Sequence, residues 1–498
     1  MTELLKKIIT KISLIKVEYF VCIVVLIFYF LLWYINPGNK IIAFAFSILF
    51  LILYFRIKDF RVSILITYVS SMIIFTGKTY HIQLIPAGIY SEEIYPSGYV
   101  VPFIISPKLI IAFLMLVILL RDLIHSKFRI TKFRSLDLIL IFFFIWTIIS
   151  DIFGSKKPEI SILFSLTSIE SLILYLYFRT YIQKYPKIPQ FIFWIFVSMI
   201  IFESAISLQQ YVLNSPIFKN IEHQVDIVYF GRAADELMFK FRPLGTFPHA
   251  NILAAWFSYL LSILLVCLYK NSSYFLKTIF IMGLTVLIIT ISRSSWLGIL
   301  ISIMLILYIG EKVKKIRFPN IIKMQKLGFL ALGFFLLIFF VLPRAEKSLY
   351  SFVEGEGGGF LRLSQIQDTI ALIKQYPVLG VGSAMSVQEG LSINPRGIYS
   401  LAPITIHNWY LLVAAEHGLP ALILFSIFVI ISIKKLAIAV LGSRMLTFNE
   451  YIMLGAFGGI MAILVIGFFQ NFLVLNLVLM TSGLFLQTDV NNNHNEES

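Results

Sequence analysis

Long apolar runs alternate with short polar segments along almost the whole chain. Each run has about the length that a helix needs to cross a hydrocarbon core of roughly 30 Å, which is about 20 residues. The runs lie at residues 19–35, 41–55, 62–76, 103–120, 136–152, 160–178, 188–211, 250–269, 275–291, 294–310, 327–343, 407–433, 450–468 and 471–487. The pattern predicts an all-α fold, a polytopic transmembrane helical bundle of about 14 spans. A fused or re-entrant helix in the second and third runs, or in the last two, would lower the number to about 12.

The composition agrees with a protein whose main solvent is lipid. The chain is 59% hydrophobic and only 13% charged, whereas soluble domains are about 45–50% apolar. Its net charge of +15 does not indicate a nucleic-acid partner, because the Lys and Arg residues are dispersed among short loops. Cys22 and Cys267 both lie inside apolar runs. Neither a disulfide nor a thiolate metal site is therefore expected.

The distribution of Lys and Arg among the loops predicts how the chain is oriented in the membrane. The loops on the side of the N-terminus are shorter, yet they hold more of the 41 Lys and Arg residues. Positive loops face the cytoplasm, so both termini are expected there. The parity of the spans then places three long loops outside, at residues 77–102, 212–249 and 344–406. The chain is predicted to be a multi-pass protein of the inner or plasma membrane.

The predicted organisation has four parts. N-terminal transmembrane helices occupy residues 1–240, and a core at 241–433 includes the extracytoplasmic loop 344–406; C-terminal transmembrane helices at 434–487 precede a polar, disordered tail at 488–498. Within the loop, helical spacing predicts a helix that ends at Tyr376-Pro377 and has one apolar face, formed by Leu363, Ile366, Ile370 and Ile373. The loop is expected to fold as a partly helical cap over a cavity.

Arg293 is the first residue that could carry chemistry. The apolar stretch from 275 to 310 is too long for one helix, and its only polar interval is Ser292-Arg293-Ser294-Ser295. An arginine in a tight outer hairpin opposes the positive-inside bias, so it indicates a site; the alternative is a cation that snorkels to the interface. Arg362 and Arg242 also lie outside, where they could instead be ordinary solvated arginines. Guanidinium groups suit phosphate, and several on one cavity would suit a pyrophosphate.

His407 opens the run that follows the long loop. A histidine at the outer edge of the membrane can accept a proton near neutral pH, so it is a candidate general base; the alternative is a hydrogen-bonded interface histidine. Glu416 is expected to end or brace this helix near His417 and Gly418. The other histidines show no spacing typical of metal ligands, and no two carboxylates are close enough in sequence to suggest a catalytic pair.

Taken together, these residues form an ordered series of motifs. The series is Phe241-Arg242-Pro243-Leu244-Gly245-Thr246-Phe247 with Asn251, then Ser292-Arg293-Ser294-Ser295-Trp296-Leu297-Gly298, then Arg362 with Pro377 to Gly382, and finally His407-Asn408-Trp409-Tyr410-Leu411 with Glu416-His417-Gly418. In this order, and with the largest outer loop between the second and last motifs, the region 241–423 resembles the O-antigen ligase and polymerase family.

The resemblance implies an all-helical membrane glycosyltransferase. Such an enzyme takes a glycan from an undecaprenyl pyrophosphate carrier and joins it to a glycan, lipid or protein acceptor on the extracytoplasmic face, without a metal, nucleotide or other cofactor. By matching motif, Arg293 and Arg362 would bind pyrophosphate, with Arg242 as a further candidate, and His407 would be the base. Membrane lipids are the other expected partners. The order around His249 departs from the family pattern, so no role is assigned to that residue.

Three other interpretations remain open at this point. A polymerase of the same family would use similar residues, but the paired arginine-rich outer loops of dedicated polymerases cannot be located here, which favours a ligase. A transporter or flippase of lipid-linked oligosaccharide would show inverted repeats and broken helices near the midplane. A structural scaffold would leave the motif series unexplained. The discriminating observation is whether Arg293, Arg362 and His407 face one outward cavity.

Overall fold

Helices account for most of the elements in the computed structural model. The model describes residues 15–36, 38–74, 78–85, 99–125, 135–182, 184–215, 217, 241–270, 273–313, 358–395, 397, 399, 404–444, 447–471 and 474–485. The helices are α2 (Val17–Ile35), α3 (Asn39–Ile57), α4 (Phe60–Ser71), α5 (Pro107–Ile124), α6 (Ser135–Phe153), α7 (Pro158–Tyr181), α8 (Ile188–Leu213), α10 (Ala250–Lys270), α11 (Tyr274–Ile289), α12 (Arg293–Tyr308), the π-helix η1 (Ile309–Val313), α15 (Gly358–Gln375), α16 (Ser386–Ile393), α18 (Trp409–Gly442), α19 (Phe448–Gly467) and α20 (Val474–Phe485).

Within this described part, nine helices are long and apolar enough to cross a membrane. The chain is therefore a polytopic helical membrane protein, and the figure of about 14 spans stays a prediction. The predicted run at 327–343 and the tail at 488–498 lie outside the described residues. The division of the chain at residues 240 and 433 also stays a prediction.

The all-α prediction is corrected in one place. Strands β1 (Lys78–Ile85) and β2 (Tyr99–Ile105) pair in an antiparallel two-stranded sheet. Tyr80, Ile82 and Leu84 alternate with polar residues, a period-2 pattern typical of a strand with one buried face. The span predicted from residue 103 accordingly begins later, at Pro107, where Ser106 caps α5 by accepting a hydrogen bond from the backbone N–H of Leu109 at 3.3 Å.

The core of the bundle is built around α19. It packs against α10 and α12, while α18 packs on α6, α2 on α8 and α20 on α7. Two glycines one helical turn apart let α19 approach α10 closely: a Cβ at Gly455 would lie 2.5 Å from Cα of Ile263, and one at Gly459 would lie 2.7 Å from the ring of Tyr259. Small residues at this spacing are typical of helix contacts in membranes, where packing replaces the hydrophobic effect.

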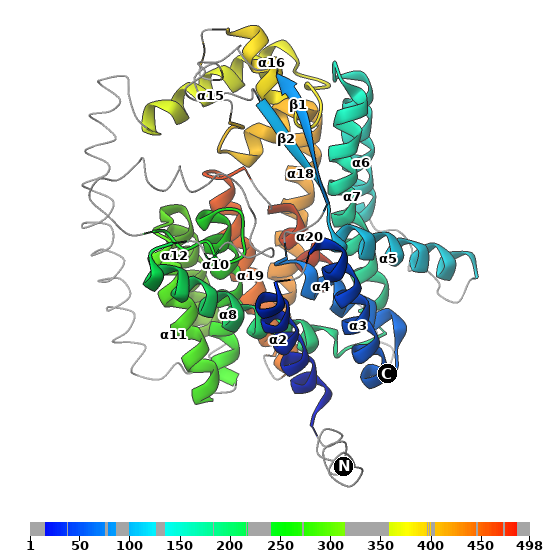
Figure 1. The fold of residues 1–498 in the computed structure, drawn as a ribbon, viewed down its shortest axis with the longest axis vertical. Helices are drawn as coiled ribbons and strands as arrows, with labels where there is room; N and C mark the ends of the chain where they lie inside the picture. The colour runs from blue at the N-terminus through cyan, green and yellow to red at the C-terminus, as the bar shows by residue number, and fades with distance from the viewer. Residues whose placement is uncertain are drawn as a thin grey trace.

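One end of the bundle, called the cap end below, carries β1, β2, α15 and α16 (Figure 1). The turn between α6 and α7 is at this end too, because Nζ of Lys157 donates to the carbonyl of Leu84 at 3.3 Å. At the opposite end, the turns α7–α8 and α18–α19 meet, since Nδ2 of Asn449 donates to the carbonyl of Pro186 at 3.0 Å. These contacts agree with the prediction from the sequence that successive loops lie on alternate sides of the membrane.

The cap helix α15 exists as predicted, with its apolar face only partly buried. Leu363 and Ile370 are 42% and 40% exposed, whereas Gln365, Thr369 and Leu372 are buried. The hydroxyls of Thr369 and Tyr399 are 3.0 Å apart. Ile366 and Ile373 are half-buried, so the apolar face is only partly turned inward, and hydrogen bonds help to orient the helix.

Candidate functional site

The segment before α10 folds into a turn held by two buried side chains of α8. Oε1 of Gln210 accepts hydrogen bonds from the backbone N–H groups of Leu244 (3.1 Å) and Gly245 (2.9 Å), and its Nε2 donates to the carbonyl of Gly245 at 2.8 Å. Oε2 of Glu203 accepts from the N–H of Thr246 at 3.0 Å. Because a buried backbone N–H without a partner costs free energy, these two side chains determine where the turn can sit.

This turn positions Arg242 at the cap end of the bundle. Nε of Arg242 donates to the carbonyl of Thr290 at 2.9 Å, and its Nη2 donates to Oδ1 of Asn251 at 2.9 Å. The guanidinium thus joins the end of α11 to the start of α10. A guanidinium has five N–H donors, so this anchoring leaves donors for a ligand.

Gly245 is the residue that makes the turn possible. Its φ is +61°, and a Cβ there would lie 2.1 Å from Oε2 of Glu203. Replacing Gly245 by alanine is expected to destabilise the protein by about 1–3 kcal/mol, the cost of a strained backbone conformation. Thermal unfolding of the purified protein measures this loss. Gly442→Ala is the matched control, because a Cβ at Gly442 meets nothing within 4 Å; equal stability of the two variants would contradict the tight-turn interpretation.

Arg293 is the first residue of α12, after a sharp turn from α11. Ile291 in this turn has φ 53°, a left-handed conformation that is rare for a β-branched residue. The hydroxyls of Ser292 and Ser295 are 3.0 Å apart, and the carbonyl of Ser295 accepts from the hydroxyl of Ser258 at 3.1 Å. The polar interval therefore breaks the apolar stretch as predicted, and it leaves Arg293 exposed.

Arg362 and His407 come together because α15 contacts the segment before α18. Nε2 of Gln365, one turn after Arg362, donates to the carbonyl of Ile404 at 3.1 Å, three residues before His407. Asn408 then caps α18, since its Oδ1 accepts from the N–H of Leu411 at 3.0 Å. His407 is thus placed directly before a helix N-terminus. Its Nδ1 is buried and has no hydrogen-bond partner in the described part of the chain.

Electrostatic coupling shows that the predicted site residues lie in one place. Burial, followed by the charges of Arg293 and Arg362, lowers the pKa of Arg242 to about 10. Arg362 keeps exposed surface, yet the protein around it partly desolvates it, and this desolvation and then repulsion by Arg293 lower its pKa. Burial, followed by the charge of Arg362, lowers the pKa of His407 to about 4. The structure therefore brings the three arginines within electrostatic range of one another, and it places His407 within range of Arg362.

His249 belongs to the same cluster, although the sequence analysis assigned it no role. Burial, followed by the charges of Arg242, His407 and Arg362, lowers its pKa to about 4. The backbone N–H of Asn251 donates to its Nδ1 at 3.0 Å, so the proton of the neutral ring is on Nε2. Two features of the sequence could have pointed to these residues. His249 stands beside a recognised motif, and Glu203 and Gln210 are polar side chains seven residues apart inside a predicted span, where polar residues are costly.

The arrangement favours an anionic ligand. The three arginines repel one another, and every charged group that perturbs Arg242, Arg362, His249 or His407 within the described residues is itself a cation or a histidine. Three helices, α10, α12 and α18, also begin in this region. Helix N-termini present free N–H groups and a partial positive charge, which attract anions and repel arginines. A ligand with several negative charges would relieve both kinds of repulsion.

Comparison with known proteins agrees with the motif series. Residues 278–426 match the family model described as O-Antigen ligase. The matched range includes Arg293, Arg362 and His407, while Arg242 lies before it. No curated protein matches the chain. The match confirms the resemblance that the motifs predicted and supports O-antigen ligase- or polymerase-like processing of glycans at a membrane.

Proposed function

We propose that this protein is a membrane glycosyltransferase that moves a glycan from a polyprenyl pyrophosphate carrier, such as undecaprenyl pyrophosphate, to an acceptor hydroxyl outside the cell. The observation that carries the proposal is the convergence of Arg242, Arg293 and Arg362, with His407 beside Arg362. In the proposal the arginines bind the pyrophosphate and His407 accepts the proton of the acceptor. His249, neutral with its proton on Nε2, donates a hydrogen bond to a substrate oxygen.

The proposed step needs positioning and charge stabilisation. The acceptor hydroxyl gives its proton to His407 while its oxygen forms a bond to the anomeric carbon of the glycan. The bond between that carbon and the pyrophosphate oxygen breaks, and polyprenyl pyrophosphate leaves with the bonding electrons. The donor is already activated, so fixed cations at the leaving group lower the barrier as negative charge develops there.

Reconstitution tests the function directly. The full chain in liposomes should convert a synthetic polyprenyl pyrophosphate-linked glycan into free polyprenyl pyrophosphate, with the glycan transferred either to a separate glycan acceptor or to a second donor molecule. Transfer to a separate acceptor supports a ligase, and elongation of the donor glycan supports a polymerase. Movement of the donor across the bilayer without any change in its bonds would instead support a transporter and contradict the proposal.

The proposal requires the cap end to face the outside of the cell. A cysteine replacing exposed Lys374 in α15 should react with a membrane-impermeant maleimide on intact cells, and one replacing exposed Lys184 between α7 and α8 should react only after permeabilisation. The natural Cys22 and Cys267 are buried, so background labelling should be low. The reverse pattern would place the arginine cluster on the cytoplasmic side and refute the proposed acceptor location.

A further inference from the structure

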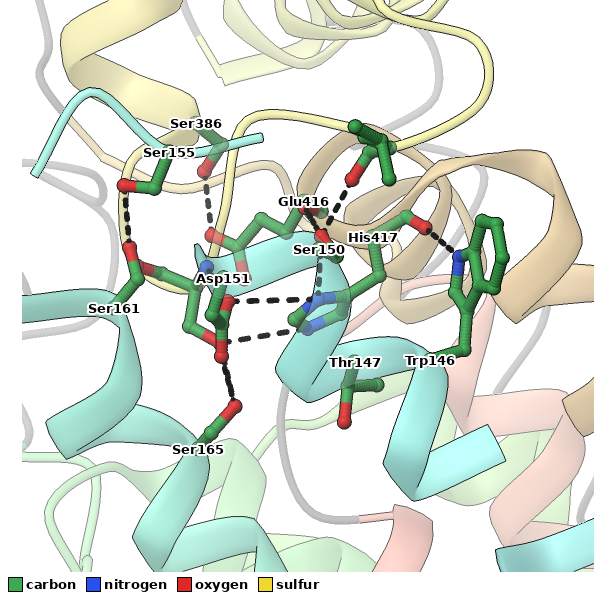
Figure 2. A network of polar contacts seen from close by, with 12 residues as sticks. Trp146, Thr147, Ser150, Asp151, Ser155, Ser161, Ser165, Ser386, Glu416 and His417 are labelled. Atoms are coloured by element: carbon green, nitrogen blue, oxygen red, sulfur yellow. Dashed lines mark hydrogen bonds and ion pairs between the residues drawn. The ribbon is translucent and has the colours of Figure 1, made fainter. Parts of the chain in front are cut away.

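A second polar network lies where α6, α7 and α18 meet the segment between α15 and α16 (Figure 2). At its centre, the carboxylate of Asp151 in α6 is fully buried. Ser383 donates to it twice, from its backbone N–H at 2.7 Å and from its hydroxyl at 3.2 Å. The hydroxyl of Ser165 also donates to Asp151. A buried charge with this many partners holds the backbone of residue 383 against α6.

The histidine of α18 completes the contact with α6. Nδ1 of His417 lies 3.8 Å from Oδ1 of Asp151 and 3.3 Å from the hydroxyl of Ser150. Its Nε2 lies 3.5 Å from the hydroxyl of Ser383, and Nε1 of Trp146 donates to its carbonyl at 3.0 Å. As Figure 2 shows, the ring lies between α6 and the segment that follows α15.

Glu416, the neighbour of His417, holds the start of α16. Its Oε1 accepts from the hydroxyl of Ser386 at 2.9 Å, and the backbone N–H groups of Ala384 and Ser386 also donate to the carboxylate. Its carbonyl accepts from the N–H of Gly382 at 2.8 Å. A carboxylate at the first turn of a helix satisfies N–H groups that would otherwise have no partner.

Glycines allow these two segments to come together. Gly380 and Gly418 have φ of +68° and +78°; a Cβ at Gly380 would lie 2.4 Å from the carbonyl oxygen of Glu416, and one at Gly418 would lie 1.9 Å from that of Val378. Gly418 is also where α18 breaks. Two motifs that are distant in sequence are therefore the two halves of one contact.

This contact is directly connected to the helix that carries Arg362. Residue 376 follows the last residue of α15, and Leu372 near the end of α15 packs in a small core with Val381, Met385 and Ala415. Fixing residues 376–386 therefore fixes the C-terminal end of α15. Nearer its N-terminal end, α15 is fixed by the hydrogen bond from Gln365 to the carbonyl of Ile404, three residues before His407.

We infer that Asp151, Glu416 and His417 form a clamp on residues 376–386 that positions Arg362 for the pyrophosphate of the donor. They are positioning residues that act through Arg362 and do not contact the reacting atoms. This inference rests on the proposed function, because it presumes that Arg362 binds the donor. It adds a specific role for three residues outside the arginine cluster.

Asp151→Asn tests the clamp, since it keeps the shape of the side chain and removes its charge. The Michaelis constant for the lipid-linked donor is expected to rise about tenfold, because an amide oxygen accepts the hydrogen bonds of Ser383 and Ser165 more weakly than a buried carboxylate does. The turnover number at saturating donor should stay within about threefold of the parent value. Hydrogen exchange of the peptide covering residues 377–386 should accelerate. Thr147→Val is the control, since Thr147 is buried in α6 but bonds only to the carbonyl of Phe144 in its own helix.

A double-mutant cycle separates positioning from general stability. If Asp151 acts through Arg362, then adding Asp151→Asn to Arg362→Lys should raise the Michaelis constant for the donor by less than about twofold. Additive effects, or a loss of turnover number with an unchanged Michaelis constant, would overturn the inference. If the Asp151→Asn protein does not insert into the membrane, Glu416→Gln can replace it in the same double-mutant cycle with Arg362→Lys.

Hydrogen exchange distinguishes failure of the clamp from failure of the proposed function. Unchanged exchange at 377–386 in the Asp151→Asn protein would overturn the clamp whatever the enzyme does. A different outcome is accelerated exchange in the Asp151→Asn protein with normal donor kinetics in both the Asp151→Asn and the Arg362→Lys variants. It would show that the clamp exists but does not affect donor binding, and it would overturn the role proposed for Arg362.

Discussion

Replacing His407 by alanine is expected to slow glycan transfer by roughly 10²–10⁴-fold, the usual effect of losing a general base. Donor binding should survive, because the arginines are unchanged. The structural reason for expecting a base here is the position of His407 directly before the N-terminus of α18. Its Nδ1 is buried and has no hydrogen-bond partner among the described residues. Single-turnover transfer and equilibrium binding of the donor measure the two effects separately.

His407→Gln separates proton transfer from orientation. Glutamine can keep a hydrogen bond to the acceptor, but it cannot accept the proton. A Gln variant that binds the donor and remains inactive supports the base. Substantial activity of the Gln variant would reduce His407 to a positioning role, and an Ala variant that transfers glycan at the parent rate would refute the catalytic assignment and favour the transporter.

The pH dependence of this reaction should reflect the cationic surroundings of His407. Burial and then the charge of Arg362 lower its pKa to about 4, so the imidazole is neutral, and able to accept a proton, above that pH. The acid limb of kcat/KM, which reports the free enzyme, is expected near this value. Bound pyrophosphate offsets the arginine charges and should move the acid limb of kcat to higher pH. An acid limb of kcat/KM near 6.5, the ordinary histidine value, would contradict the coupling.

Arg293→Lys and Arg362→Lys are each expected to reduce kcat/KM for the donor by about 10- to 100-fold. Lysine keeps the charge but cannot make two parallel N–H contacts to a phosphate, and a hydrogen bond to a charged group contributes about 1.5–3 kcal/mol. The measurement is initial rates at low donor concentration. Arg444→Lys, an exposed arginine between α18 and α19, is the control.

Two outcomes would count against these roles. Near-normal kinetics in both Lys variants would mean that Arg293 snorkels to the interface and that Arg362 is simply solvated. A loss that is equal in the Arg444→Lys control would point to a general effect of the membrane preparation. Binding of inorganic pyrophosphate, measured as thermal stabilisation of the protein, should also weaken in the site variants alone.

The fold was largely accessible from sequence because lipid imposes one requirement on every span. A backbone inside hydrocarbon must satisfy its own hydrogen bonds, so long apolar runs become helices. The strand pair β1–β2 was missed, since residues 77–102 were treated only as a loop although Tyr80, Ile82 and Leu84 alternate with polar residues. The residues that α15 turns inward could not be predicted from the sequence, for a related reason. Its partners, such as Tyr399 for Thr369, are distant in sequence.

The amino-acid sequence by itself determined the membrane class and the motif series, because apolar length and residue type act locally. It also singled out Arg293, which breaks an overlong apolar run. Only the tertiary structure decided that Arg242, Arg362 and His407 all lie within electrostatic range of His249. Their proximity depends on side chains that hold distant segments together, such as Gln210 on Gly245 and Asp151 on Ser383. A hydrogen bond between residues 232 positions apart leaves no periodic pattern in either segment, so it is visible only once the chain is folded.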